Sequence, residues 1–568
     1  MKTMKYIKNK FLLLALSGLT MTSCADFLDI TPLTMVVEDN YWNEKSDVEQ
    51  IVTGCYTRMQ DNDFMYRLLA WGEMRSDNVT VGNNVSSTSS EYNLLTENLL
   101  STNAYTTWAP FYDVINRCNL VIEKAPEVAK IDPSFTQSDV NAIIAEVSGL
   151  RALCYFYLVR TFKDVPFYTY AIRSDEQITP LPATSGDEIL QTLAADLEGK
   201  VNQAVKVYSV DTYNYGRITQ DAIHAILADI YLWLENYSKV DQHCTAIIES
   251  KMEQFEEAGY IVDYPLIPDV SSTGTTNGMA YNAIFGTGGS VESIFELDFN
   301  DEDVDKSNNL VPTFYYKHKD GELAGWLYPT QSLTYEFYMP SAFLADENGK
   351  VQDTRLYESV KPNAYDAPMS STIVKYVYTT MPKLPVTDPA SYVSGRTFKN
   401  GANWIFYRTS EILLMKAEAL VNMVTSPDGS LTEEDQARYH EAFQLVEAVN
   451  SRSYLAKTAS KDSELDESDY QLKENLNTLI LEERRREFLF EGKRWFDLVR
   501  WSRRAGNTEL LKEKVSEKFT ENASSATAKL TNMNAIYFPY NYDELKVNQN
   551  LKQNPAYSDE NSSIETTK

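Results

Sequence analysis

The chain has 568 residues, more than one compact core accommodates, and its 43% hydrophobic and 23% charged residues are the balance of an ordinary globular protein. A disordered, collagen-like or disulfide-scaffold chain is thereby excluded. The 81 acidic and 52 basic residues give a formal net charge of −29, which argues against nucleic acid and anionic lipid surfaces as partners. Aromatic residues make up 12%, with 37 Tyr, which favours either many packed helix seams or a wet, stacking binding surface.

Residues 1–23 are predicted to be an export signal. A lysine-rich start precedes a short apolar core at 11–16, far below the roughly 20 apolar residues that cross a bilayer. The junction Thr22-Ser23-Cys24 resembles the lipobox of bacterial lipoproteins, in which the cysteine is diacylated and becomes the new N-terminus. We therefore expect lipidation at Cys24, the alternative being an ordinary signal peptide with a chance cysteine. No other stretch is expected to span a membrane, so the mature protein should be soluble apart from its tether.

Helices are predicted in the first third of the chain. Apolar residues recur at helical spacing over 45–60, 105–128 and 138–163. A fourth helix is expected over 186–206, because Ser185 and Glu188 form the pattern of a capping box at its start.

Two later segments predict helical hairpins. Residues 217–252 carry small residues opposite large aromatic ones, with a break at 235–237, and over about 34 residues this pattern resembles a tetratricopeptide repeat. A second hairpin of the same kind is expected from 403–424 and 436–452. The fold class expected is mainly α: tetratricopeptide-like helical hairpins that scaffold a loop-rich region with a few short strands.

Residues 262–400 differ in kind from the helical blocks around them. Runs rich in Gly, Ser and Thr alternate with short strand-like pieces such as 294–297, and irregular chain of this length usually carries function. The expected division is 1–23 signal peptide, 24–261 N-terminal helical part, 262–400 loop-rich ligand-binding region and 401–568 C-terminal helical part that packs back on the scaffold.

The cysteines that remain after Cys24 have no short paired spacing. No Cys-x-x-Cys occurs and the four His are scattered, so no zinc cluster is predicted. One disulfide can form after export, but the spacing leaves its pairing open. The candidates are Cys55, Cys118, Cys154 and Cys244.

Catalytic motifs do not occur where the sequence can be tested for them. There is no P-loop, no zinc-protease motif and no serine-hydrolase elbow. The acidic run 301–305 resembles a calcium loop, but Lys306 replaces the turn glycine and Pro312 the bidentate Glu, so we interpret it as a solvated loop. A carboxylate pair for glycoside hydrolysis remains an alternative, because its spacing is a three-dimensional property. We predict no cofactor, no metal and no catalytic residue.

The charged run 481–501 is the most distinctive segment. Its pattern predicts a helix, an irregularity at Gly492, and a further turn or two of helix. Asp497 and Arg500 lie at i,i+3, as do Glu491 and Arg494, so each pair can form an ion pair. Because acids interleave with the arginines and aromatic residues supply a core face, we interpret the run as a structural ion-pair network rather than a site.

This run resembles the signature of the SusD/RagB family, the surface glycan- and nutrient-binding lipoproteins of Bacteroidetes. Five further blocks resemble family segments in the same order and span nearly the whole mature chain. They lie at 24–32, 150–166, 325–331 with 353–355, 407–419, and 550–557. Lys163 departs from the family pattern, which usually has Gly there.

The resemblance implies a function. Family members generally bind oligosaccharides without cutting them, and each serves as a lid over a SusC-like, TonB-dependent transporter. It therefore implies a lipid-anchored cell-surface protein of the outer membrane that delivers glycans to such a partner. Two alternatives stay open: a peptide-binding lid, as in the RagB branch, and a lipid-anchored glycoside hydrolase.

A glycan site should combine exposed aromatic rings with polar side chains on loops. Two stretches supply this mixture, around 75–93 and 281–328, and the resemblance implies ligand contacts from the same stretches, with Arg75, Tyr92 and Trp326 foremost. The alternative for Trp326 is that it packs against the helices. Trp108 and Trp233 are assigned to the core. The full set of expected ligand-binding residues is Trp326, Arg75, Tyr92, Tyr328, Tyr281, Asn282, Tyr315, Tyr316, Asn78 and Asn93.

Overall fold

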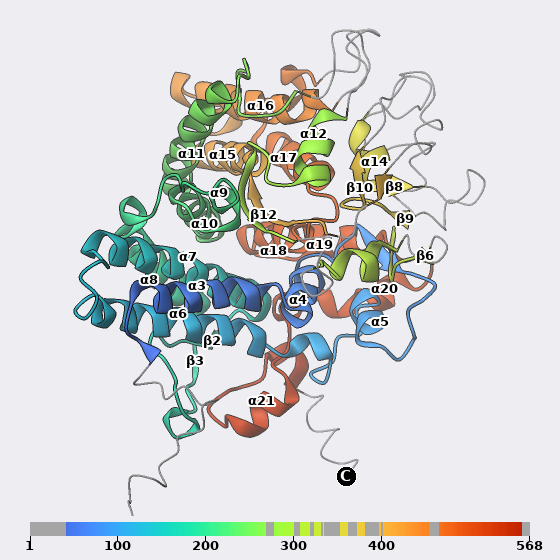
Figure 1. Ribbon diagram of the computed structural model, residues 1–568. Coiled ribbons are helices and arrows are strands. Elements are labelled where there is room, and N and C mark those ends of the chain that lie inside the picture. Colours follow the sequence, from blue (N-terminus) through green and yellow to red (C-terminus); the bar gives the residue numbers. More distant parts are fainter. Residues whose placement is uncertain are drawn as a thin grey trace, which may run out of the picture.

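The computed structural model describes residues 41–268, 278–299, 307–317, 323–330, 333, 353–361, 372–380, 397–398, 401–453 and 465–558. Figure 1 shows a stack of helices on one side of the molecule and, beside its upper part, the short strands and helices of the middle region. The mainly helical fold class is confirmed. Cys24 and the acidic run 301–305 lie outside the described residues.

The helical stack runs through most of the chain. Each helix packs on the one before or after it in the stack, so that α3 contacts α6, α6 contacts α7, α10 contacts α11, α11 contacts α15, and α15 contacts both α16 and α17. The members are α3 (Lys45–Met59), α6 (Ala109–Val128), α7 (Gln137–Phe162), α8 (Gly186–Glu198), α10 (Gln220–Trp233), α11 (Tyr237–Glu257), α15 (Thr409–Met423), α16 (Glu433–Arg452) and α17 (Lys473–Glu487). Both predicted hairpins, α10–α11 and α15–α16, are confirmed.

Shorter elements surround the stack. The remaining helices are α4 (Asn62–Gly72), α5 (Ser90–Leu95), α9 (Tyr213–Gly216), α12 (Met279–Tyr281), α14 (Thr354–Ser359), α18 (Arg494–Ala505), α19 (Glu509–Ser516), α20 (Ala523–Ala526) and α21 (Tyr542–Val547).

The strands described form antiparallel pairs. These are β1 (Val79–Val81) with β7 (Leu327–Pro329), β2 (Val165–Pro166) with β3 (Ala183–Thr184), β4 (Ser293–Leu297) with β12 (Trp404–Arg408), β5 (Tyr316–Lys317) with β6 (Leu323–Ala324), β8 (Val360–Lys361) with β9 (Thr372–Ile373), and β10 (Tyr378–Thr380) with β11 (Thr397–Phe398).

Two local predictions are wrong. The helix expected from residue 403 begins at Thr409, because the preceding five residues pair with β4 as strand β12. Ser185 precedes α8 but makes no capping bond; the amide of Gly186 donates instead to the carboxylate of Asp164, 3.0 Å away. In both places a partner distant in sequence replaces the local interaction.

Helix α7 corrects the expectation that no stretch beyond the signal could span a membrane. It is long and apolar enough to do so by length and composition, and most of it is buried inside the protein. From Ala145 to Phe162 every residue is buried. We therefore interpret α7 as the central core helix of the stack.

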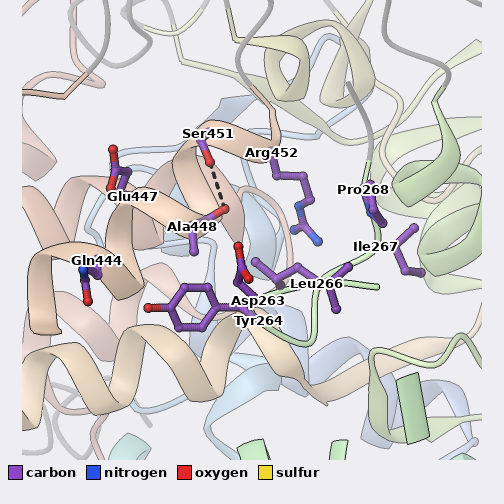
Figure 2. Close-up of a pocket in the computed structure, with 11 residues that line it drawn as sticks. Asp263, Tyr264, Leu266, Ile267, Pro268, Gln444, Glu447, Ala448, Ser451 and Arg452 are labelled. Carbon is purple, nitrogen blue, oxygen red and sulfur yellow. Dashed lines mark hydrogen bonds between the residues drawn. The ribbon is translucent and has the colours of Figure 1, made fainter. Parts of the chain in front are cut away.

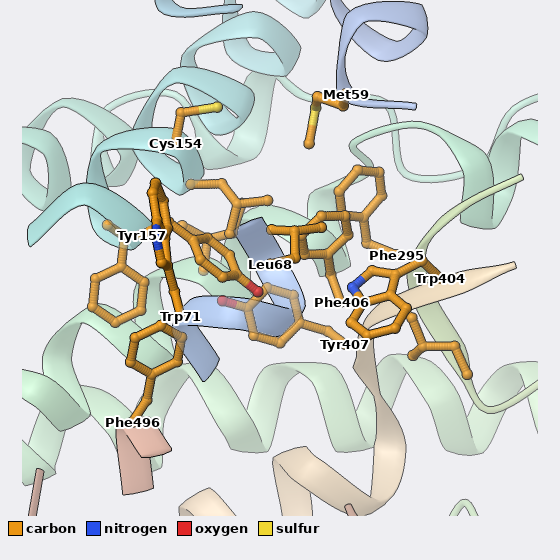
Figure 3. Packing of buried hydrophobic residues seen from close by; sticks show 14 of the residues in the cluster. Met59, Leu68, Trp71, Cys154, Tyr157, Phe295, Trp404, Phe406, Tyr407 and Phe496 are labelled. Carbon is orange, nitrogen blue, oxygen red and sulfur yellow. The ribbon is translucent and has the colours of Figure 1, made fainter. Parts of the chain in front are cut away.

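The larger of the two described hydrophobic clusters joins residues of the N-terminal helices, the middle region and the C-terminal part, whereas the smaller one lies among α15, α16 and α17. Figure 3 shows Tyr157 of α7 with Phe496 of α18, and Phe295 of β4 with Phe406 of β12. The rings of Phe295 and Phe406 stack with centroids 5.1 Å apart. The same cluster contains Trp108 and Trp233, 4% and 2% exposed, which confirms their assignment to the core.

A buried network of ion pairs is built on residues 481–501. The carboxylate of Glu487 accepts hydrogen bonds from Arg355 (2.9 Å), Arg408 (2.5 Å) and Arg452 (2.5 Å). None of these four side chains is more than 9% exposed. Burial alone raises the pKa of a carboxyl group, but the guanidinium groups hold the pKa of Glu487 well below its usual value.

The second carboxylate of the network corrects one predicted pair. Glu491 binds Lys375 at 2.7 Å and Arg408 at 2.8 Å. Arg494, its expected partner, instead binds the carboxylate of Asp77 at 2.8 Å. Both arginines are more than nine-tenths buried, so each is held by the acid that the fold brings to it.

The interpretation of the run as a structural network is confirmed. The Asp497–Arg500 pair is present at 3.0 Å. The predicted irregularity at Gly492 is a connection between α17 and α18, where Gly492 has φ +71°, in the left-handed region that favours glycine. A Cβ there would lie 3.2 Å from the carbonyl oxygen of Leu68.

Glu487→Gln is expected to lower the free energy of unfolding by about 3–5 kcal/mol, because it leaves three buried guanidinium groups short of negative charge. The matched control is Glu253→Gln in the exposed pair with Lys206, with an expected change below about 0.5 kcal/mol. Since the folded-state pKa of Glu487 is depressed, its contribution to stability is complete at neutral pH, begins to fall below about pH 4.5 and is lost only below the much lower folded-state pKa. Denaturant unfolding over a series from pH 7 to about pH 2 should show the wild-type and Glu487→Gln proteins converging toward the acidic end; equal stability at pH 7 would contradict the prediction.

Candidate functional site

The structure brings together two of the stretches that the sequence singled out. Strand β1 follows Asn78 directly and pairs antiparallel with β7, which follows Trp326 directly. The register places Val79 opposite Pro329 and Val81 opposite Leu327. One further hydrogen bond, from the Gly82 amide to the Trp326 carbonyl (2.9 Å), extends the ladder to Trp326. The segments around 78–82 and 326–330 therefore form one small two-stranded platform.

Trp326 is half-buried and has support on one side. Its ring meets Phe314 edge-to-face, with centroids 5.3 Å apart, and its amide donates to the carbonyl of Thr313 at 3.1 Å. Phe314 packs in turn against Tyr66 of α4, with centroids 4.9 Å apart. The ring is thus fixed against the core while part of it faces solvent, which combines the two alternatives that the sequence left open.

Gly82 sits where a side chain does not fit. A Cβ there would lie 2.6 Å from the carbonyl oxygen of Trp326 and 2.9 Å from that of Gly325. Both contacts are with backbone atoms, so neither can be relieved by a side-chain rotation. Because Gly82 has no side chain, its backbone lies directly against the backbone of Trp326 and helps to hold that residue in place.

Tyr92 and Asn93 belong to the short helix α5, which packs against β1. The N-cap residue Ser89 accepts from the amide of Tyr92 at 3.2 Å. The Asn93 side-chain oxygen accepts from Asn98 at 3.2 Å. Tyr92 and Asn93 are half-buried, as is Asn282 of the middle region.

Arg75 is not the exposed ligand contact that the loop composition predicted. It is 2% exposed and donates to Glu97 at 2.8 Å. Its guanidinium group also lies 4.2 Å from the ring centroid of Trp495 and donates to the carbonyl of Ala535 at 3.0 Å. Arg75 therefore fastens the loop before β1 to the C-terminal part.

The expected exposure of Asn78 is also wrong. It is fully buried; its amide donates to Glu73 at 2.8 Å and its side-chain oxygen accepts from Arg485 at 3.0 Å. Glu73 has two neutral donors, Asn78 and the Gly492 amide, so burial raises the pKa of this carboxyl group to about 7. Asn78 orders the start of β1.

The four tyrosines of the middle region are likewise buried, with exposed fractions from 0% to 7%. The Tyr315 hydroxyl donates to the carbonyl of Phe490 at 2.6 Å, and burial raises the pKa of this phenol well above its usual value. An aromatic residue in irregular chain gives the same sequence signal whether it faces solvent or closes a core. The expected exposure is wrong for Tyr281, Tyr315, Tyr316 and Tyr328.

Four of the ten expected residues thus keep accessible surface: Trp326, Tyr92, Asn93 and Asn282. An aromatic ring with amide groups offers stacking and hydrogen bonding, but no nucleophile or acid–base pair. In the described parts of the chain no group of three His, Cys, Asp or Glu side chains is placed to hold a metal ion. Sequence reasoning missed Phe314 and Gly82, whose roles depend on contacts distant in sequence.

Figure 2 shows a separate open cavity, of about 420 Å³, between the segment 262–268 and α16. Tyr264, Asp263 and Glu447 lie on it. Arg452 reaches its wall, but its guanidinium group is engaged by Glu292 (2.5 Å) and Glu487. The cavity therefore borders the ion-pair network.

A second hollow, of about 400 Å³, is lined largely by aromatic and apolar side chains of α6, α21 and the chain around β2. The rings of Tyr112 and Tyr168 stack there with centroids 5.7 Å apart, and Tyr170 at the edge is 44% exposed. No pattern in the sequence indicated this groove.

Two family profiles match the chain in succession. The profile described as "Starch-binding associating with outer membrane" matches residues 26–232, and that of the SusD family matches residues 341–557. A SusD-like protein of Formosa agariphila is 27% identical over 520 residues, covering 88% of this chain and 92% of the relative. A SusD-like protein of Bacteroides ovatus is 25% identical over 232 residues, 40% of each chain.

Solved structures share the fold. A SusD superfamily protein of Bacteroides vulgatus superposes with a TM-score of 0.67 at 22% identity, covering 91% of this chain and all of the other. The surface glycan-binding protein A of Bacteroides uniformis superposes with a TM-score of 0.61 at 20% identity, covering 90% and 99%. The helical stack and the short strand pairs of the described residues are thus the fold of these solved proteins. The chain belongs to the SusD-like family, as the charged run and its companion blocks indicated.

Gly82→Ala is expected to disrupt the platform locally, because the added methyl group meets two backbone carbonyls. We expect a loss of about 1–3 kcal/mol in unfolding free energy and faster hydrogen exchange at the amides of residue 82 and Thr330, which bond across the platform. The control is Gly429→Ala, where a Cβ meets nothing within 4 Å. Unchanged exchange protection in Gly82→Ala would show that the platform does not depend on this close approach.

Proposed function

We propose that the protein binds glycans at the cell surface, without cleaving them, and delivers them to a SusC-like TonB-dependent transporter of the outer membrane. The observation that carries the proposal is the half-buried ring of Trp326, held on the β1–β7 platform with part of its surface in solvent. Membership of the SusD-like family supports the proposal. The match to a family profile described as starch-binding and the structural similarity to a surface glycan-binding protein support it as well.

The chemistry of sugars fits this surface. A pyranose ring presents an apolar C–H face that lies flat on an aromatic ring, while its hydroxyl groups need donors and acceptors at the edge. Trp326 supplies the flat surface, and the Asn93 amide and Tyr92 hydroxyl of α5, which packs against β1, supply candidate polar partners. Arg75 and Asn78 take a different role in this proposal: they position the platform from beneath.

The proposed tether and partner rest on sequence and family. The lipobox-like junction at Cys24 supports a diacylated N-terminus, and two acyl chains hold a protein stably on a membrane. The net charge of −29 disfavours adsorption of the protein body to anionic lipid. The helical stack offers the extended surface that a large transporter needs as a partner.

Trp326→Ala is expected to abolish glycan binding and to change the melting temperature by only about a few degrees, since the ring is half-buried. The lipid-free protein would be screened on a glycan array that includes malto-oligosaccharides, and the best binder titrated calorimetrically. The control is Tyr170→Ala, an exposed aromatic residue in the other groove. Binding that survives in Trp326→Ala but not in Tyr170→Ala would move the site, and sugar fragments in the chromatogram of the titrated mixture would contradict binding without cleavage.

Cys24→Ala is expected to release the protein from membranes or leave it unprocessed, because the acyl chains have no attachment point. Outer membranes carrying the wild-type protein, solubilised in mild detergent, should yield a TonB-dependent barrel in comparable amount. Normal membrane retention of Cys24→Ala would rule out the tether. Repeated recovery of the wild-type protein alone would rule out the partnership.

A further inference from the structure

Two buried cysteines face each other across the first helix pair of the stack. Cys55 lies in α3 and Cys118 in α6, and both are fully buried. Their sulfur atoms are 3.9 Å apart, with the Cys118 thiol directed at the Cys55 sulfur. All four described cysteines are thiols in the structure. A disulfide bond of about 2.05 Å would require the two sulfurs to approach by about 2 Å.

The other cysteines are placed differently. Cys154 of α7 lies in the same core and is close enough to Cys55 for an electrostatic interaction. Cys244 lies in α11, beside Lys416 and Asp241. Neither has a sulfur contact among those that the structure describes, so Cys55–Cys118 is the pair that the fold selects among the alternatives that the spacing left open.

We propose that Cys55 and Cys118 form a disulfide bond in the exported protein, which joins α3 covalently to α6. Two thiols lose two protons and two electrons, one S–S bond forms, and a disulfide of an envelope thiol oxidoreductase or of oxidised glutathione accepts both electrons and protons and becomes two thiols. The inference rests on the proposed export, because a reducing cytoplasm keeps such a pair as thiols.

The structure also indicates when the bond forms. The hydrogen bond from Cys118 and then burial raise the pKa of Cys55 well above its usual value, with Glu146 adding to the effect and Arg117 opposing it. Because the thiolate is the attacking species and neither sulfur is accessible in the packed core, the folded pair reacts slowly with an oxidant. Oxidation therefore belongs to the folding stage, while α3 docks on α6 and the oxidant still reaches the sulfur atoms. The folded protein then retains whichever redox state it acquired.

The test refolds the full mature chain, with Cys24→Ala so that the position of the lipid carries no thiol, from denaturant with a glutathione redox buffer or with dithiothreitol. Free thiols are then blocked with iodoacetamide and the peptides are mapped by mass spectrometry. With glutathione we expect one disulfide, Cys55–Cys118, with Cys154 and Cys244 alkylated, and a melting temperature roughly 5 °C above that of the reduced form. Protein extracted from its native membranes should carry the same bond.

Two variants keep the outcome interpretable. Cys118→Ala should remove the difference in melting temperature between the oxidised and reduced preparations, whereas Cys244→Ala, a buried cysteine without a sulfur neighbour, should retain it. Four alkylated cysteines after oxidative refolding or in the native protein, or a bond to Cys154 instead, would overturn the proposal. Glycan titration of both redox forms separates the two claims: a cross-linked protein that binds no glycan counts against the proposed function and leaves the disulfide standing.

Discussion

The arrangement of the whole chain depends on the buried carboxylate of Glu487. Its three arginine partners come from three places: Arg355 from the middle region, Arg408 from the end of β12 and Arg452 from the end of α16. A buried charge is tolerated only with its partners in place, so each segment must reach the same point before any of them is stable there. The interaction thereby fixes the loop-rich region to the helical stack, a constraint that non-directional apolar packing alone does not impose.

A second set of buried charges fixes the position of the candidate site. Asp77 is held by Arg494 and Arg485, and Arg75 by Glu97, immediately before β1 begins. These contacts set the direction in which β1 leaves the core, and β1 in turn carries β7 and Trp326. Arg75 and Asn78, which sequence reasoning placed among the ligand contacts, therefore lie buried beneath the β1–β7 platform. A preorganised aromatic surface loses little conformational freedom when a flexible sugar chain binds.

Local patterns predicted the helices and both hairpins, because helical periodicity depends only on the spacing of apolar residues that are close in sequence. The features that the local patterns missed all depend on partners distant in sequence. The residues of strand β12 fit a helical pattern, and only the pairing with β4 identifies them as a strand. Ser185 fits the pattern of a helix cap, but Asp164 accepts the hydrogen bond from the first amide of α8 instead. Arg75 resembles a ligand contact because its counter-charge and the ring of Trp495 are invisible in the local sequence. Six of the ten candidate residues are therefore buried, because local sequence could not rank them by exposure.

The last part of the chain packs against the first and is hydrogen-bonded to it. The Phe538 amide donates to the carbonyl of Thr161 in α7, and the amide of Tyr542 to that of Ser101. A growing polypeptide that still lacks α17 and everything after it has no counter-charge for Asp77 and no ring for Arg75. A chain that ends before α17 therefore lacks part of the native core, and this part forms only once the C-terminal elements are present. A prematurely terminated product is therefore left with uncompensated buried charges and is open to proteases.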